Sequence, residues 1–332
     1  MRLSQFTYKL PKSLIAQSPI RPRDHSRLLV VDGRKLSHRH FFDIADYFEK
    51  GDILVLNETK VSRAKITGKK TSGSPVELII QKRIYSDRYE CRVKGHKPKV
   101  GDKHVYKNGL KGEITGKDKD IYTISFNKNI TKQLTKRFAL PLPPYITQKI
   151  RREEEYQTSF ARKEGSVAAP TAGFHFTPVL LNKLKKKGVK IVKISLHIDF
   201  GTFIPIEAED VTKHKMRAEY FEVSKAAANT INKRNGRLFV VGTTCVRALE
   251  SAADRKGRIR DIKETTDLYI YPGYRWKTRI DALITNFHLP KSTLLLLVSA
   301  FIGRERLLKA YQTAVRRRYR FYSFGDSILL FR

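Results

Sequence analysis

Three histidines lie next to uncharged polar residues at points where predicted strands or turns end, and such positions suit proton transfer. Histidine changes its charge near neutral pH more readily than any other unperturbed side chain. Each of the three could equally be a structural histidine with satisfied hydrogen bonds. The candidates for proton transfer are His175, His197 and His288.

Hydroxyl, amide and guanidinium side chains accompany these histidines and could hold a polar ligand. Thr171 lies in a run bracketed by Pro170 and Gly173, which predict a sharp turn before a helix that begins near Thr177. A well-packed connector leading to a capped helix is the alternative interpretation of this run. The candidates for substrate binding are Thr171, Thr202, Thr243, Thr244, Arg247 and Asn286.

The segment from Phe239 to Glu250 has the pattern of a buried strand that turns at Gly242 into a helix. Helix N–H groups at the carboxyl end of a strand are where α/β folds bind anions or nucleotides. The segment has neither the Gly-Lys-Ser/Thr of a P-loop nor a GxGxxG run. The alternative is a capped helix with an Arg247–Glu250 pair on its surface. Cys245 has no adjacent histidine in sequence, so we expect a small buried thiol.

Two pairs of potential metal ligands each fall on one face of a predicted strand, His38 with His40 and His197 with Asp199. A protein metal site usually needs three or four converging ligands. The sequence therefore favours hydrogen bonding or proton transfer at these positions over a metal site.

The elements that must position these residues alternate between strand-like and helix-like runs over most of the chain. Short β-rich runs separated by Gly, Asp, Asn and Lys clusters interrupt this alternation from about residue 62. Such closely spaced strands predict a small antiparallel barrel or sandwich. We therefore expect an α/β protein in which residues 1–61 plus 142–332 form a large mixed α/β catalytic domain and residues 62–141 form an inserted antiparallel β-barrel domain.

Individual elements follow from hydrophobic periodicity and from capping and turn residues. Helices are predicted at 179–187, 224–234, 244–253, 292–302 and 304–318, with a charged helix around 153–161. Outside the inserted domain, strands are predicted at 28–32, 35–40, 53–56, 189–198, 238–243, 267–271 and 280–286.

The chain is strongly basic, with 67 Lys and Arg against 32 Asp and Glu and a formal net charge of +35. Such an excess favours a nucleic acid or another polyanion as partner, because lysine and arginine displace counterions from phosphates. A host whose proteins are all basic is the alternative, and the even spread of the charge supports it in part. The aromatic and basic stretch 269–279 could stack on bases, or pack on the core as a hairpin.

The cellular location is indicated by the cysteine pattern and by the length of the apolar runs. Its two cysteines form no CxxC pair, which fits a reducing compartment. No apolar run has the length of a signal peptide core or of a membrane span. We expect a cytoplasmic protein without a membrane partner.

These segments, taken together, resemble the S-adenosylmethionine:tRNA ribosyltransferase-isomerase family of the queuosine pathway. The resemblance covers essentially the whole chain in collinear order. Its strongest motifs are GSVAAPTAGFHFTP at 165–178, VGTTCVRALESA at 241–252, YIYPGY at 269–274 and DALITNFHLP at 281–290.

The resemblance implies transfer of the ribosyl part of S-adenosylmethionine to 7-aminomethyl-7-deazaguanine at the tRNA wobble position. The ribose is isomerised on the way, so that the products are epoxyqueuosine-tRNA, adenine and methionine. The implied substrates are S-adenosylmethionine, as the ribosyl donor, and tRNA carrying the aminomethyl base. No metal is implied, and we expect a monomer.

The implied reaction needs a base for the proton next to the sulfonium and a proton donor for the departing adenine. We therefore expect the candidate residues to converge on one pocket. Two other functions stay open at this point. A catalytically silent RNA-binding chaperone or complex subunit would bind tRNA without releasing adenine, and a methyltransferase would produce S-adenosylhomocysteine.

Overall fold

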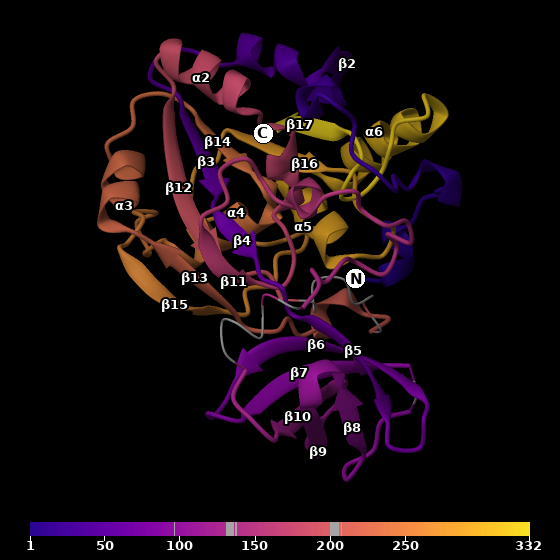
Figure 1. Ribbon diagram of the computed structural model, residues 1–332. Helices are drawn as coiled ribbons and strands as arrows, with labels where there is room; N and C mark the ends of the chain where they lie inside the picture. Colours follow the sequence, from indigo (N-terminus) through magenta and orange to yellow (C-terminus); the bar gives the residue numbers. More distant parts are fainter. Residues whose placement is uncertain (96, 131–135, 137, 200–205, 207) are drawn as a thin grey trace. The chain divides into compact units, whose positions relative to one another are not determined.

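The chain divides into two compact units. The computed structural model describes residues 1–95, 97–130, 136, 138–199, 206 and 208–332. One unit consists of Met1–Lys60 and Pro143–Arg332, and the other of Val61–Leu142 (Figure 1).

A nine-stranded mixed sheet forms the centre of the larger unit, with the order β15-β13-β12-β3-β14-β16-β17-β1-β2. In that order the strands are Ile262–Thr266, Glu219–Val223, Lys190–Leu196, Ile53–Asn57, Leu238–Val241, Ala282–Asn286, Ser327–Phe331, Arg27–Asp32 and Lys35–His40. A separate two-stranded sheet pairs β4 (Thr59–Val61) with β11 (Lys163–Ser166).

Four neighbouring strands of the large sheet, β12, β3, β14 and β16, run parallel to one another. Their side chains alternate between two buried faces: Ile53 and Val55 of β3 belong to one apolar cluster, Leu54 and Leu56 to the other. Burial on both faces explains the continuous apolar runs of these strands. Because the four strands are parallel, their carboxyl ends meet at one edge of the sheet, the usual ligand edge of α/β folds.

Strand β17 brings two further segments to that edge. It pairs antiparallel with β16, so that Ser327 lies opposite Asn286. It pairs parallel with β1, where Ser327 lies beside Leu28. The residues immediately before β17 and before β1 therefore reach the edge where the parallel strands end.

Helices cover both faces of the sheet (Figure 1). Helices α3 (Lys225–Asn232), α4 (Gly242–Ala252), α5 (Thr293–Ile302) and α6 (Arg304–Arg316) contribute to one apolar cluster. Helix α2 (Pro178–Lys186) and the 3-10 helix η4 (Phe41–Tyr47) contribute to the other. Further 3-10 helices are Leu3–Phe6, Lys12–Leu14, Arg23–His25, Lys107–Gly109, Glu153–Tyr156, Thr171–His175 and Val211–Lys213.

The smaller unit is a closed antiparallel barrel with the strand order β10-β7-β6-β5-β8-β9. Alternate side chains such as Ile66, Leu78 and Ile124 fill its interior. Full closure leaves the barrel without sheet edges that could pair with other chains. The strands are β5 (Lys65–Lys70), β6 (Pro75–Arg83), β7 (Arg88–Lys94), β8 (Lys103–Tyr106), β9 (Lys111–Asp118) and β10 (Ile121–Phe126).

The predicted fold class, mixed α/β with a small antiparallel barrel, is confirmed, but several elements differ. The predicted strand at 267–271 is wrong, since the strand in this region is β15, which pairs with β13. Tyr269 and Tyr271 instead pack on each other, with ring centroids 5.1 Å apart. The charged helix around 153–161 is only the 3-10 helix Glu153–Tyr156.

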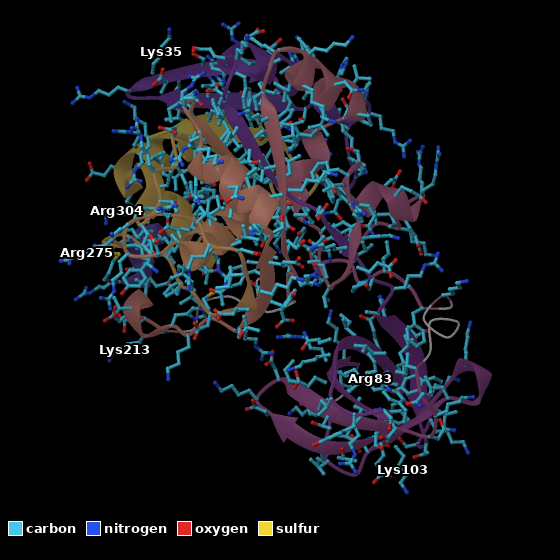
Figure 2. The ribbon with its side chains drawn as sticks, turned by 90° about the vertical axis from the view of Figure 1, so that its left-hand side faces the viewer. Lys35, Arg83, Lys103, Lys213, Arg275 and Arg304 are labelled. Carbon is cyan, nitrogen blue, oxygen red and sulfur yellow. The ribbon has the colours of Figure 1, made fainter. Side chains whose placement is uncertain are left out.

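Basic side chains are spread over the surfaces of both units (Figure 2). Lys35, Lys213 and Arg275 project from well-separated parts of the larger unit, and Arg83 and Lys103 from the barrel. None of the helices in the described part of the chain is long and apolar enough to cross a membrane.

Candidate active site

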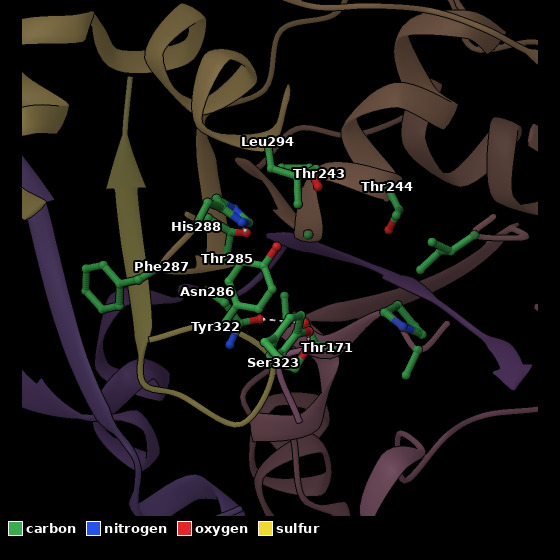
Figure 3. A pocket seen from close by; sticks show the side chains of 16 residues that line it. Thr171, Thr243, Thr244, Thr285, Asn286, Phe287, His288, Leu294, Tyr322 and Ser323 are labelled. Carbon is green, nitrogen blue, oxygen red and sulfur yellow. Dashed lines mark hydrogen bonds between the residues drawn. The ribbon is translucent and has the colours of Figure 1, made fainter. Parts of the chain in front are cut away.

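A pocket opens where the parallel strands of the large sheet end (Figure 3). It encloses about 530 Å³ of empty space, part of which is open to solvent. The polar side chains that line it are Tyr145, Thr171, Thr243, Thr244, Thr285, Asn286, His288, Tyr322 and Ser323.

The topology explains why these residues meet. Thr243 and Thr244 begin the helix that follows β14, and Asn286 ends β16 with His288 just beyond it. Tyr322 comes from the segment before β17, the antiparallel partner of β16. Five of the predicted site residues therefore share the pocket, namely Thr171, Thr243, Thr244, Asn286 and His288.

None of the described residues that line the pocket carries a formal charge, although the chain as a whole is strongly basic. Electrostatic attraction at this site must therefore come from dipoles, hydroxyl groups and amides. In a site of low dielectric constant such groups act more strongly than they do in water.

His288 presents one unoccupied ring nitrogen in this pocket. Its Nε2 lies 3.0 Å from Thr285 Oγ1, and its Nδ1 has no hydrogen-bond partner among the described residues. Tyr8 donates to the carbonyl of His288, and the His288 N–H donates to Tyr311 Oη at 3.1 Å. Burial lowers the pKa of His288 to about 3, so the imidazole is neutral at pH 7.

His175 lies behind the pocket and has both ring nitrogens engaged. Its Nδ1 lies 2.7 Å from Ser26 Oγ, and its Nε2 lies 3.2 Å from Asn286 Nδ2. Thr171 donates to Asn286 Oδ1 at 3.0 Å, the contact drawn as a dashed line in Figure 3. An amide N–H can only donate, so Nε2 of His175 accepts and Nδ1 carries the proton. Burial, with a smaller effect from Arg23, lowers the pKa of His175 to about 3.

Two tyrosines form an aromatic wall of the pocket. The rings of Tyr145 and Tyr322 meet edge to face with centroids 4.0 Å apart, and the hydroxyl groups of Tyr145 and Ser323 hydrogen-bond to each other. Tyr322 has a φ of 73°, a left-handed conformation that is costly for a bulky residue. The residue is buried, with 7% of its surface exposed, and its hydroxyl has no hydrogen-bond partner among the described residues. Strain of this kind concentrates at functional sites.

The start of helix α4 forms another part of the wall. Gly242 makes the turn from β14 with a φ of 81°, which a residue other than glycine rarely adopts. No side chain caps this helix. The hydroxyl of Thr244 lies 3.4 Å from Asn57 Nδ2 at the end of β3, whereas that of Thr243 has no partner in the described part of the chain.

Arg247, a predicted binding residue, does not line the pocket. It forms a buried ion pair with Glu219, and its Nε donates to the carbonyl of Leu268 at 2.8 Å. Glu219 in turn accepts from the backbone N–H of Asp199 at 2.8 Å. The alternative of an Arg247–Glu250 surface pair is wrong, because both residues are buried and Glu250 accepts hydrogen bonds from Tyr274, Lys277 and Thr278.

His197 also lies outside the pocket lining. Its ring contacts Tyr220 edge to face with centroids 5.4 Å apart, and burial lowers its pKa. A side chain at Gly165 would come within 2.6 Å of His197 Nδ1, so glycine is required for this close approach. Ile198, the next residue, does line the pocket. The remaining candidate, Thr202, falls outside the described residues.

The other segments with potential chemistry are explained by packing. His38 Nδ1 lies 2.8 Å from Tyr319 Oη, and His40 stacks on Phe42. Within the described residues no group of three or more His, Cys, Asp or Glu side chains could hold a metal ion. Cys245 is a buried thiol, as expected, and burial raises its pKa.

Sequence reasoning missed four residues that line the pocket and one that lies behind it. Tyr145, Thr285, Tyr322 and Ser323 line the pocket, and Ser26 contacts His175. The apolar run at 327–331 was a signal for β17, and recognising that strand would have directed attention to Tyr322 and Ser323.

Comparisons with known proteins agree with this architecture. Residues 3–330 match the family model described as queuosine biosynthesis protein. A protein of Symbiobacterium thermophilum called S-adenosylmethionine:tRNA ribosyltransferase-isomerase is 48% identical over 99% of this chain and 100% of its own length. A protein of the same name from Fusobacterium nucleatum is 46% identical, with 99% and 97% covered.

A solved structure is similar along the whole chain. It is the crystal structure of S-adenosylmethionine tRNA ribosyltransferase from Thermotoga maritima at 2.00 Å resolution. The two chains are 34% identical, and the superposition has a TM-score of 0.56 and covers 98% of this chain and 99% of the other.

Proposed function

This chain belongs to the family of queuosine biosynthesis proteins, and from that membership we propose that it catalyses the reaction that names its curated relatives. The reaction transfers a ribosyl group from S-adenosylmethionine to tRNA and isomerises it. Full-length similarity at 45–48% identity supports this activity for the whole chain.

The acceptor in this proposal is the aminomethyl nitrogen of 7-aminomethyl-7-deazaguanine at the wobble position of tRNA. The products are epoxyqueuosine-tRNA, adenine and methionine. S-adenosylmethionine serves as ribosyl donor, and the reaction proceeds without a metal ion. The lining of neutral polar groups suits the donor, because it holds no cationic side chain that would repel the sulfonium.

The observation that carries the proposal is the unoccupied Nδ1 of His288 beside Asn286 in the pocket. The reaction must remove a proton next to the sulfonium and deliver a proton to the departing adenine. A histidine that accepts the proton from the carbon next to the sulfonium can then donate it to the departing adenine. No other acid is needed for this proton transfer. Burial keeps the imidazole of His288 neutral at pH 7 and makes its imidazolium form a strong acid, which favours delivery of the proton to adenine.

The remaining candidates hold other groups in place in this proposal. His175 positions Asn286, and Asn286, with Thr171, binds the ribose hydroxyls. Thr243 and Thr244 bind the ligand at the start of α4, with Thr202 as a further contact. His197 and Arg247 support the part of the pocket wall that includes Ile198. His197 does so by its close approach to Gly165. Arg247 does so through Glu219, which accepts a hydrogen bond from the N–H of Asp199.

The proposed setting follows from the substrates. The enzyme acts as a cytoplasmic monomer on tRNA, without a membrane partner, and the larger unit supplies the catalytic pocket. Domain boundaries at residues 61 and 142 remain our proposal for a catalytic domain with an inserted barrel domain.

The decisive experiment is incubation of the protein with S-adenosylmethionine and tRNA that carries the aminomethyl base, followed by nucleoside mass spectrometry. Epoxyqueuosine and free adenine are the expected products. Formation of S-adenosylhomocysteine would instead indicate a methyltransferase. Salt-sensitive tRNA binding without adenine release would indicate a catalytically silent RNA-binding protein.

A further inference from the structure

We infer that the N-terminus of helix α4 binds the carboxylate of the methionyl part of S-adenosylmethionine, an inference that rests on the proposed function. The site consists of the backbone N–H groups of the first turn of α4 and the hydroxyl of Thr243. Binding at this site would place the methionyl end of the substrate against the start of helix α4.

The first observation is a buried helix end without a cap. The first turn of any α-helix leaves N–H groups without partners inside the helix. In this chain Thr177 caps α2, Ser224 caps α3 and Ser292 caps α5 through side-chain oxygens. Helix α4 has no side-chain cap, although its first residues are buried. A helix end buried in this way needs another acceptor.

The second observation is the hydroxyl of Thr243, which points to a ligand independently of the helix. Thr243 is only 5% exposed and lines the pocket, yet its hydroxyl has no hydrogen-bond partner among the described residues. Figure 3 shows Thr243 at the pocket beside Leu294. The hydroxyl is not one of the fully buried polar atoms that lack a partner, so it faces the space of the pocket and is available to a ligand there.

Charge decides which chemical group fits. A helix N-terminus carries the equivalent of roughly half a positive charge and favours anions. No lysine or arginine is found among the described lining residues, so a bound carboxylate has no cationic side chain there to neutralise it. The carboxylate is the only anionic group of S-adenosylmethionine, and the uncapped helix end matches it.

The burial of the site favours an anionic group at the end of a ligand over one in the middle of a polymer. Thr243 and Thr244 are 5% and 9% exposed, so the helix end is reached from inside the pocket. A carboxylate at the end of a chain can enter there. A tRNA phosphodiester continues on both sides and would have to bring its neighbouring nucleotides along. With the methionyl end at α4, the ribosyl part extends toward Asn286 and His288, which line the same pocket.

The test compares two ligands on three proteins. Binding of S-adenosylmethionine and of its decarboxylated analogue is measured by titration calorimetry with the wild type, Thr243→Val and Thr243→Ser. We expect Thr243→Val to bind S-adenosylmethionine about tenfold more weakly, which is typical of a lost hydrogen bond to a charged group, and to bind the analogue unchanged. Thr243→Ser keeps the hydroxyl and should resemble the wild type.

A matched control is Thr244→Val, because its hydroxyl contacts Asn57. We expect it to affect both ligands equally. The inference is overturned if Thr243→Val weakens both ligands by the same factor, or neither, while circular dichroism shows a folded protein. It is also overturned if the variant loses only tRNA affinity, which would indicate a phosphate site.

These outcomes are distinguishable from failure of the proposed function. A folded wild-type protein that binds neither ligand contradicts the proposed function itself. A wild type that binds both ligands equally well contradicts only the carboxylate site.

Discussion

His175 and Asn286 form a hydrogen bond in which the histidine acts on the pocket only through the amide. The 3.2 Å contact from Asn286 Nδ2 to His175 Nε2 fixes the orientation of the amide, and Thr171 holds its oxygen. With Ser26 at the other ring nitrogen, His175 has no nitrogen left for the substrate. We therefore propose that His175 positions Asn286 rather than carrying a proton.

We expect His175→Gln to retain most of the activity and His175→Ala to lose it by about ten- to a hundredfold. Glutamine can still accept from Asn286 and donate to Ser26, whereas alanine leaves both without a partner. Steady-state kinetics of adenine release measure the difference. Equal, complete loss in both variants, with folding intact, would show that His175 carries a proton.

His288→Gln should lower kcat by about a hundredfold or more, because general acid–base catalysis contributes factors of this size. The affinity for S-adenosylmethionine should change little, since glutamine keeps a polar group beside Thr285. Calorimetry and single-turnover assays separate the two effects. A variant with normal kcat and weak binding would assign His288 to ground-state binding instead.

Acid should destabilise the protein through its two buried histidines. The pKa of each falls from 6.5 to about 3 on folding, so the unfolded chain takes up protons that the folded chain refuses. Their stabilising contribution is full above pH 6.5 and is lost as the pH falls toward 3.

The slope should reach about 1.4 kcal/mol per pH unit for each histidine. Urea unfolding at several values between pH 7 and pH 4 measures it. Carboxyl groups titrate in the same range, so the comparison with His175→Gln isolates the histidine. An unchanged slope in that variant would show that His175 is protonated in the folded state.

Removing the guanidinium of Arg247 should destabilise the larger unit by about 3–5 kcal/mol, because it breaks the buried ion pair with Glu219. Arg247→Met tests this in denaturant unfolding. Adding Glu219→Gln removes that charge and keeps an acceptor for the Asp199 N–H, so the double variant should recover about half of the loss.

If the double variant is stable but cannot bind S-adenosylmethionine, Arg247 acts on the ligand directly. If the double variant binds S-adenosylmethionine as the wild type does, Arg247 acts by supporting the part of the pocket wall that includes Ile198.

Treatment with EDTA followed by gel filtration should leave adenine release unchanged, since the proposed reaction needs no metal. Magnesium should be restored in a parallel sample, because tRNA folding depends on it. Activity that returns only with a transition metal such as zinc would contradict the proposal.

Much of the fold could be predicted from local patterns. The apolar strands β3, β12, β14 and β16 are buried on both faces, and their continuous hydrophobic runs are the expected sign of that position. The barrel strands were recognisable from short alternating runs between turn residues. Helices with an N-cap, such as α3 after Ser224, also started within a residue or two of the predicted position.

The site was less predictable because its geometry depends on strand order. The sequence shows that Asn286 ends a strand, but only the antiparallel pairing of β16 with β17 brings Tyr322 near it. Similarly, nothing local distinguishes Arg247, which faces Glu219, from Thr243, which faces the pocket. The pairing of strands far apart in the sequence determines both the position of Tyr322 and the surroundings of Arg247 and Thr243.

The central place of β17 has a consequence for how the protein is made. Strand β1 is translated long before its neighbour on one side, which consists of residues 327–331. Until that stretch has been translated, β1 and β16 cannot join in one sheet, and the wall of the pocket formed by Tyr322 does not exist. A nascent chain therefore lacks a complete pocket until residues 327–331 have been translated, and during that time the edge of β1 is an unpaired strand edge that chaperones must protect.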